Sequence, residues 1–283
     1  MTAMRPAAAG LSPLPRTAGR LTFGGVLRSE LTKLRSLRST YWTLAALIVI
    51  CVGIGALFCF GQAQNLHSLH GAAYAREAAH AKQHAVAISL FGLLLGQLVI
   101  VVLGALTITS EHSTGMIRTS LASVPRRAML YTAKAVVFTA VALVVGLVTS
   151  FASFFAGQAI LSSEHVNAAL SQPGVLRAVI GGGLFLAACG LLAYGIGAIL
   201  RHTAGAITTS IALLFVVYIL SGFLPSNWAD HIDRWIPFNA GGAIWEQVSA
   251  NRMFTPWTGF AVFCAYAAVA LGAGLYLFRK RNA

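Results

Sequence analysis

The sequence predicts an all-α integral membrane protein with six transmembrane helices, an N-terminal amphipathic helix in the membrane interface and a second short amphipathic helix in a cytoplasmic loop. Of the 283 residues, 57% are hydrophobic and 10% are charged, whereas soluble domains contain about 45–50% apolar and about 25% charged residues. Six apolar runs are long enough to cross the hydrocarbon core, which takes about 20 residues. The basic residues behind the net charge of +13 lie between these runs and form no basic face on a folded domain. The charge therefore indicates membrane topology, and we expect no nucleic-acid partner.

The first two elements precede the first apolar run. Residues 1–22 mix Pro, Ala, Gly and Arg without the apolar core of a signal peptide, so we expect a disordered cytoplasmic tail. Residues 23–39 place apolar side chains on one arc, which predicts a helix lying in the inner interface. Glu30 interrupts this arc, and Lys33, three residues later, is its natural partner. A solvated edge position and a contact role both remain open for Glu30.

The six transmembrane spans follow within residues 23–283. They are predicted at residues 41–61, 86–110, 135–161, 179–200, 203–224 and 257–278. Only Arg201 and His202 separate the fourth and fifth spans, which predicts a tight helical hairpin. Glycines recur along single faces of the second and fourth spans, at Gly92, Gly96 and Gly104 and at Gly183, Gly190 and Gly197. Such faces allow close helix packing, and packing within this chain is favoured over a subunit interface.

The distribution of Lys and Arg sets the predicted orientation. Fifteen of the twenty lie in the N-terminal segment, the second and fourth loops and the C-terminus, and five lie in the other loops. Because cytoplasmic loops carry the excess of Lys and Arg, we expect both termini in the cytoplasm.

The loop between the second and third spans contains another amphipathic pattern. Ile117, Leu121 and Val124 follow i, i+4, i+7 spacing, and Pro125 ends the pattern. A short helix with one apolar side can dock a soluble partner, but a basic loop that only touches lipid headgroups fits the same residues. Both interpretations remain open at this point.

Several kinds of chemistry have no support in the sequence. None of the six runs contains Asp, Glu, Lys or Arg, which disfavours proton-coupled transport. No G-x-x-x-x-G-K-[ST] phosphate loop occurs, so we expect no ATP hydrolysis and no bound cofactor in this chain. The first outer loop holds paired histidines, His67, His70, His80 and His84, at spacings that zinc sites use. Because residues 72–85 are helix-forming and histidine is tolerated on solvated faces, we expect no metal site.

Several segments, in their order around the six spans, carry a resemblance to a known family. They are residues 28–35 (RSELTKLR) before 39–42 (STYW), then Glu111, Gly115, Arg118, Pro125-Arg126-Arg127 and Lys134, then 237–241 (PFNAG) and 256–259 (PWTG). Together they resemble ABC transporter permeases of the ABC-2 type.

The resemblance implies a permease subunit of an ATP-driven exporter in the bacterial cytoplasmic membrane. Its implied partners are a second permease subunit, identical or different, and ATP-binding subunits that carry the phosphate loop, ATP and Mg²⁺. The implied coupling helix comprises Glu111, Gly115, Ile117, Arg118, Leu121, Pro125, Arg126 and Arg127, and the interfacial helix would meet the ATPase through Glu30, Lys33 and Arg35. The implied external gate includes Trp228, Trp235, Pro237 and Asn239. A non-transporting membrane scaffold or assembly factor and an ATP-independent channel are the alternatives.

Overall fold

The computed structural model describes residues 22–36, 38–113, 116, 126–223, 225, 231–246 and 254–280. Within these ranges the chain forms helices and no strand. Six of the helical segments are long and apolar enough to cross a membrane, which confirms the predicted fold class. Helices suit this environment because all their backbone hydrogen bonds are made within one segment.

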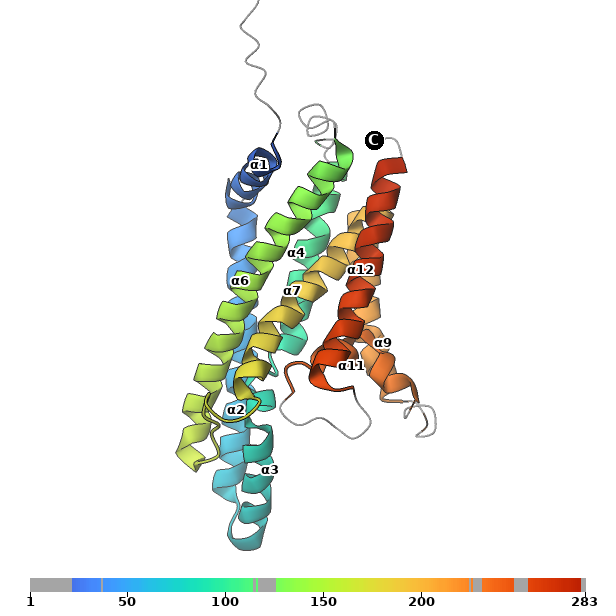
Figure 1. Ribbon diagram of the computed structural model, residues 1–283. Helices are drawn as coiled ribbons and strands as arrows, with labels where there is room; N and C mark the ends of the chain where they lie inside the picture. Colours follow the sequence, from blue (N-terminus) through green and yellow to red (C-terminus); the bar gives the residue numbers. More distant parts are fainter. Residues whose placement is uncertain are drawn as a thin grey trace, which may run out of the picture.

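The bundle is built mainly from long helices that run between its two ends (Figure 1). The long helices are α1 (Phe23–Ser36), α2 (Arg38–Ser68), α3 (Gly71–Ser89), α4 (Leu93–Ser113), α6 (Arg127–Leu161), α7 (Val175–Leu200), α8 (Thr203–Ile211) and α12 (Pro256–Lys280). Shorter elements are the 3-10 turns η1 (Ser162–Glu164) and η3 (Asp233–Trp235), the π-helical η2 (Ala212–Val216), α9 (Val217–Ser221) and α11 (Pro237–Gly242).

Helix α7 forms the centre of the bundle and packs along α4, α6 and α12. Glycines allow this close approach: a Cβ added at Gly104 of α4 would collide with the carbonyl oxygen of Gly190 in α7. A Cβ at Gly195 would lie 2.7 Å from the backbone of Ala270 in α12. The glycine faces therefore pack within this chain, as the sequence predicted.

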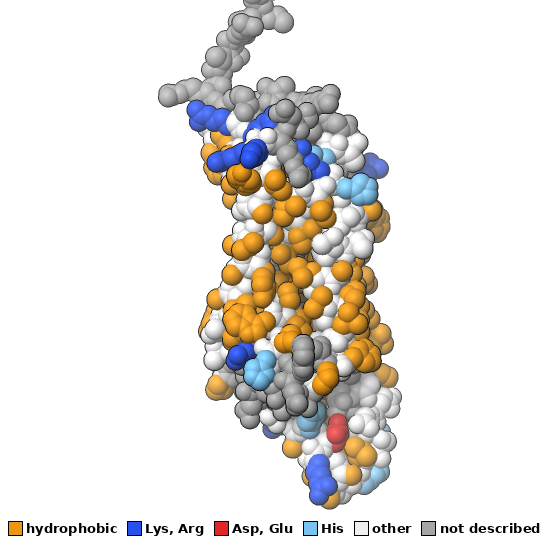
Figure 2. Space-filling view, turned by 90° about the vertical axis from the view of Figure 1, so that its right-hand side faces the viewer, with side chains coloured by type: hydrophobic (Ala, Val, Ile, Leu, Met, Phe, Trp, Pro, Cys, Tyr) orange, Lys and Arg blue, Asp and Glu red, His pale blue; other side chains and the backbone are white. Residues whose placement is uncertain are grey.

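The two ends of the bundle differ in charge. At one end lie α1, the start of α6 and the ends of α7 and α12, and we call this the α1 end; α3 projects at the other, the α3 end (Figure 1). Figure 2 shows hydrophobic side chains over the middle of the molecule and a concentration of Lys and Arg at the α1 end. This is the end that the sequence analysis assigns to the cytoplasm.

The first two spans are longer than predicted. Helix α2 continues to Ser68, and α3 continues the second span away from the bundle, with a turn at residues 90–92 between α3 and α4. Gln158 of α6 holds the end of α3 just before this turn, because its Nε2 donates to the Ser89 hydroxyl at 2.8 Å and to the Ala85 carbonyl at 3.1 Å. Charged residues such as Arg76 ended the apolar run in the sequence, but a helix outside the hydrocarbon needs no apolar run.

The fourth and fifth spans form the predicted tight hairpin. Arg201 ends α7 in the left-handed region with φ of 55°, and the ring Nδ1 of His202 accepts a hydrogen bond from the Gly205 amide at 3.2 Å. The fifth span contains the π-helical η2 and ends at Ser221, whereas the predicted span continued to residue 224. A π-helical segment has no sequence signature in this run, since its residues are uniformly apolar.

Candidate functional site

Helix α1 packs against α6 with a face that includes a carboxylate. Val26 and Glu30 are its buried residues, and Phe23 and Leu31 remain exposed. Val26 contacts an apolar cluster that includes Ile108, Tyr131 and Phe278 of three other helices. Glu30 therefore has a contact role within the chain, and the alternative of a solvated edge position is wrong.

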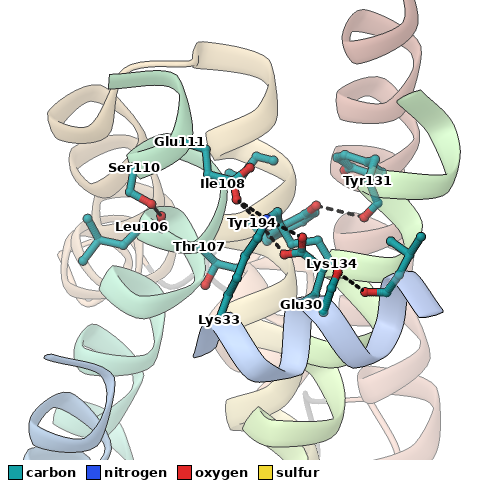
Figure 3. Close-up of polar contacts among 12 residues, drawn as sticks. Glu30, Lys33, Leu106, Thr107, Ile108, Ser110, Glu111, Tyr131, Lys134 and Tyr194 are labelled. Carbon is teal, nitrogen blue, oxygen red and sulfur yellow. Dashed lines mark hydrogen bonds and ion pairs between the residues drawn. The ribbon is translucent and has the colours of Figure 1, made fainter. Parts of the chain in front are cut away.

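Four charged side chains meet where α1 contacts α4 and α6 (Figure 3). We call Glu30, Lys33, Glu111 and Lys134 the ion cluster. Lys33 Nζ lies 2.7 Å from Glu30 Oε1 and 3.2 Å from Glu111 Oε1. Lys134 Nζ lies 2.7 Å from Glu30 Oε2 and 2.8 Å from Glu111 Oε1. The cluster confirms the predicted pairing of Glu30 with Lys33 and joins three elements through four ion pairs.

Three of the four side chains of the ion cluster are buried, and the cluster is formally neutral. Glu30, Glu111 and Lys134 are 3%, 6% and 5% exposed. A buried charge is costly unless it is paired and hydrogen-bonded, and removing one partner of such a pair leaves the other uncompensated. The neutrality of the cluster depends on α1, α4 and α6 staying together, so moving one of them alone is energetically unfavourable.

Lys33 is the most accessible member, with 38% of its side chain exposed. Partial burial by itself lowers the pKa of Lys33, but the hydrogen bond to Glu30 and the carboxylate charges of Glu111 and Glu30 outweigh it. The net effect raises the pKa of Lys33 above its ordinary value. Its ammonium therefore stays charged at neutral pH and, together with that of Lys134, balances the two carboxylates.

Two tyrosines connect the ion cluster to the rest of the bundle. Tyr131 precedes Lys134 by one helical turn, and its hydroxyl donates to the Leu271 carbonyl of α12 at 3.0 Å. The Tyr194 hydroxyl of α7 donates to the Tyr131 carbonyl at 3.0 Å. The start of α6 is thus hydrogen-bonded to both α7 and α12 beside the cluster.

The structure covers only part of the predicted coupling segment. Gly115, Ile117, Arg118, Leu121 and Pro125 lie outside the described residues. Glu111 lies in the last turn of α4 within the ion cluster.

The remaining predicted residues near the ion cluster are basic. Arg126 precedes α6, Arg127 is its first residue, and Arg35 is exposed on α1.

The predicted gate residues lie before α12, and Trp228 is outside the described residues. Pro237 begins α11, Asn239 Nδ2 donates to the Asp233 carbonyl at 3.0 Å, and the Trp235 carbonyl accepts from the Tyr266 hydroxyl at 2.9 Å. These contacts hold η3 and α11 against α12.

Sequence reasoning missed two residues that hold elements together. Lys134 was noted only as part of the family resemblance, although it makes two contacts of the ion cluster. Arg177 of α7 donates to the carbonyls of Ile244 and Glu246, each at 3.0 Å, and so secures the segment after α11. Both are single basic residues beside an apolar run, which is the only signal the sequence offers.

The outer-loop histidines form one close pair. The rings of His80 and His84 on α3 lie 4.6 Å apart between centroids. Among the described residues, no group of three or more His, Cys, Asp or Glu side chains is placed to hold a metal ion.

Comparison with known protein families gives a match. A family model described as ABC-2 family transporter protein matches residues 26–222, which is more than half of the chain. The matched region runs from α1 to α9 and includes all four residues of the ion cluster. No curated protein matches the chain.

Proposed function

Because this chain belongs to the ABC-2 family of transporter proteins, we propose that it is the permease subunit of an exporter and that a separate ATP-binding subunit docks at its α1 end. The family and the six membrane-length helices make the chain a multi-pass membrane component of an ABC transporter. The ATPase partner, the export direction and the docking site are the parts that we propose.

The observation that carries this proposal is the ion cluster. It fastens α1 to Glu111 at the end of α4, and Glu111 is the first residue of the expected coupling segment. Two segments with the pattern of docking elements therefore share one buried anchor. A displacement of either segment by a partner would act on Lys134 and hence on α6. The hydrogen bonds of Tyr131 and Tyr194 would transmit this displacement of α6 to α7 and α12, so that the helices move together as a rigid body.

The same proposal specifies the ATP-binding partner, the second permease subunit and the membrane orientation. ATP and Mg²⁺ would be bound by the partner. Its phosphate loop would supply the backbone amides and the lysine that contact the phosphates, and no such loop occurs in this sequence. A second permease subunit, identical or different, would complete the transport pathway. The basic α1 end would face the cytoplasm of a bacterial cell, where anionic lipids attract Lys and Arg.

Co-purification tests the proposal and separates it from its rivals. The chain should retain a polypeptide with a phosphate-binding loop, and Arg28→Glu with Arg35→Glu on the exposed face of α1 should reduce this retention. Lys82→Glu on α3 is the matched control and should leave it unchanged.

The rival functions predict different outcomes in the same experiment. A scaffold would show no ATP-driven transport after reconstitution with such a subunit, and a channel would conduct without it. ATP turnover by the purified chain alone would contradict the division of labour between two subunits.

A further inference from the structure

A crevice of about 400 Å³ lies at the α1 end, between α1, the start of α2 and α4. Its walls are mostly apolar and include Leu34 of α1 and Leu103 and Leu106 of α4. Leu106 lies on α4 beside the ion cluster (Figure 3). The ion cluster closes the crevice on one side and, because its charges are balanced, favours a ligand of neither sign. The crevice therefore selects an apolar occupant.

The crevice runs along α2 and α4 and ends where these helices touch. On α4 its lining extends from Leu103 to Ser110, which is about 10 Å along the helix axis. Two turns before Leu103, a Cβ added at Gly96 would collide with the sulfur of Cys51 in α2. Ser36 and Ser39, which line the crevice at the α1 end, are exposed. The crevice is thus open at the α1 end and follows the helices toward the middle of the bundle, as an acyl chain does in a bilayer.

Exposed aromatic side chains place the mouth of the crevice at the membrane interface. Tyr41 and Trp42, in the first turns of α2, are 56% and 77% exposed. Their neighbours Thr40 and Thr43 line the crevice. Because Tyr and Trp concentrate at the level of the lipid headgroups, the mouth lies at that level and the apolar walls lie at the level of the acyl chains.

The surface around the mouth is cationic. Arg28 and Arg35 of α1 and Arg38 of α2 are exposed. Among the described residues, the acidic side chains at the α1 end are Glu30 and Glu111, and both are buried in the ion cluster. A basic residue near the surface strengthens the attraction of an anionic lipid by about fivefold. The charge outside the crevice therefore favours an anionic headgroup over a neutral one.

We propose that the crevice binds one anionic phospholipid, with an acyl chain between α2 and α4 and its phosphate beside Arg38. A chain in this position contacts Leu34 on α1 and Leu103 and Leu106 on α4, whereas a lipid on the convex surface of the bundle meets protein on one side only. The bound lipid would pack against α1 next to the ion cluster and so help to hold α1 in place. The inference does not depend on an ATPase partner.

Native mass spectrometry of the full chain in detergent tests the binding of lipid. The protein is incubated with phosphatidylglycerol, which is anionic, and with phosphatidylcholine, which has no net charge, both carrying the same acyl chains. We expect one phosphatidylglycerol molecule to be retained in preference to phosphatidylcholine. Equal retention of the two lipids, or several lipids bound without a preferred first one, would overturn the proposal, because the protein would then bind only a general lipid shell.

Substitutions inside the crevice locate the acyl chain. Leu106→Trp and Thr43→Trp fill the crevice from opposite walls, and each should abolish the retention of phosphatidylglycerol. Val144→Trp is the matched control, because it adds the same ring to a side chain that is 61% exposed on α6 and does not line the crevice. The melting temperature identifies the variants that fold. Retention of the lipid by a folded Leu106→Trp or Thr43→Trp protein, or equal loss in Val144→Trp, would overturn the proposal.

A substitution at the mouth tests the headgroup and leaves the packing of the bundle intact. Arg38→Gln should reduce the preference for phosphatidylglycerol over phosphatidylcholine by about fivefold. Arg76→Gln, on the exposed surface of α3, removes the same charge at the opposite end and should leave the preference unchanged. An unchanged preference in Arg38→Gln, or an equal reduction in Arg76→Gln, would place the lipid elsewhere and contradict the proposal.

Discussion

Lys134 is the residue on which the ion cluster depends most. Its ammonium is buried and bridges Glu30 of α1 and Glu111 of α4, whereas Lys33 reaches the same carboxylates from a half-exposed position. The Glu30–Lys33 pair was predictable, because i, i+3 spacing places both on one helical face. The other two members lie on separate helices, and no periodicity within one segment links residues across a bundle.

Removing the buried ammonium should destabilise the protein strongly. Lys134→Met leaves Glu30 and Glu111 with Lys33 as their one basic partner in the cluster, so we expect a loss of about 3–5 kcal/mol in stability. Lys82→Met on the exposed surface of α3 should stay within about 0.5 kcal/mol. Thermal unfolding in detergent measures both. The double variant Glu111→Gln, Lys134→Met should recover part of the loss, and failure of Lys134→Met to lower the melting temperature would remove the cluster as an anchor.

The raised pKa of Lys33 gives a pH dependence with a defined sign. A lysine whose pKa is higher in the folded state contributes stability below its ordinary pKa of 10.5 and loses it as the pH rises through the folded value. The wild-type melting temperature should therefore fall more steeply than that of Lys33→Met as the pH rises above the ordinary lysine pKa of 10.5. Parallel curves for the two proteins would show that Lys33 makes no such contribution.

At the scale of elements, the spans were predictable, and the helix-forming residues 72–85 indicated much of α3, but the way α3 extends the second span was not predictable. An apolar run must be long enough to cross the hydrocarbon, so six runs gave six helices. The projection of α3 was not predictable in extent, because its stability comes from contacts with α2 and α6 and from the Gln158 hydrogen bonds. The same holds for the candidate site. Helix α1 was predicted from its amphipathic pattern, but its packing against α4 and α6 could be known only from the structure.

The close contact of α4 with α7 makes a substitution test possible. Gly104→Ala should destabilise the bundle by about 1–3 kcal/mol, because its Cβ would meet the Gly190 backbone and force the helices apart. Gly272→Ala on α12 is the control: a Cβ there meets no atom within 4 Å, and alanine is the better helix former. Chemical unfolding should rank Gly272→Ala at or above wild type and Gly104→Ala clearly below. The reverse order would contradict the packing.

At the scale of the whole molecule, we expect one orientation in the membrane, with the α1 end in the cytoplasm. Cys51, Cys59 and Cys189 are buried and Cys264 is exposed, so labelling needs a background in which all four are replaced. A single cysteine at Arg76 on α3 should then react with an impermeant thiol reagent in intact cells. A cysteine at Lys280, at the end of α12, should react only after the cells are opened. The opposite pattern would invert the predicted topology.

The central claim is that the α1 end receives the ATP-binding subunit. Photo-crosslinking in intact cells tests it most directly, with a photoreactive amino acid at Arg28 on the exposed face of α1 and the matched control at Arg76 on α3. We expect position 28 to form an adduct with a polypeptide that contains a phosphate-binding loop and position 76 to form none. Adducts of Arg28 with lipid alone, or an ATPase adduct from Arg76, would contradict it.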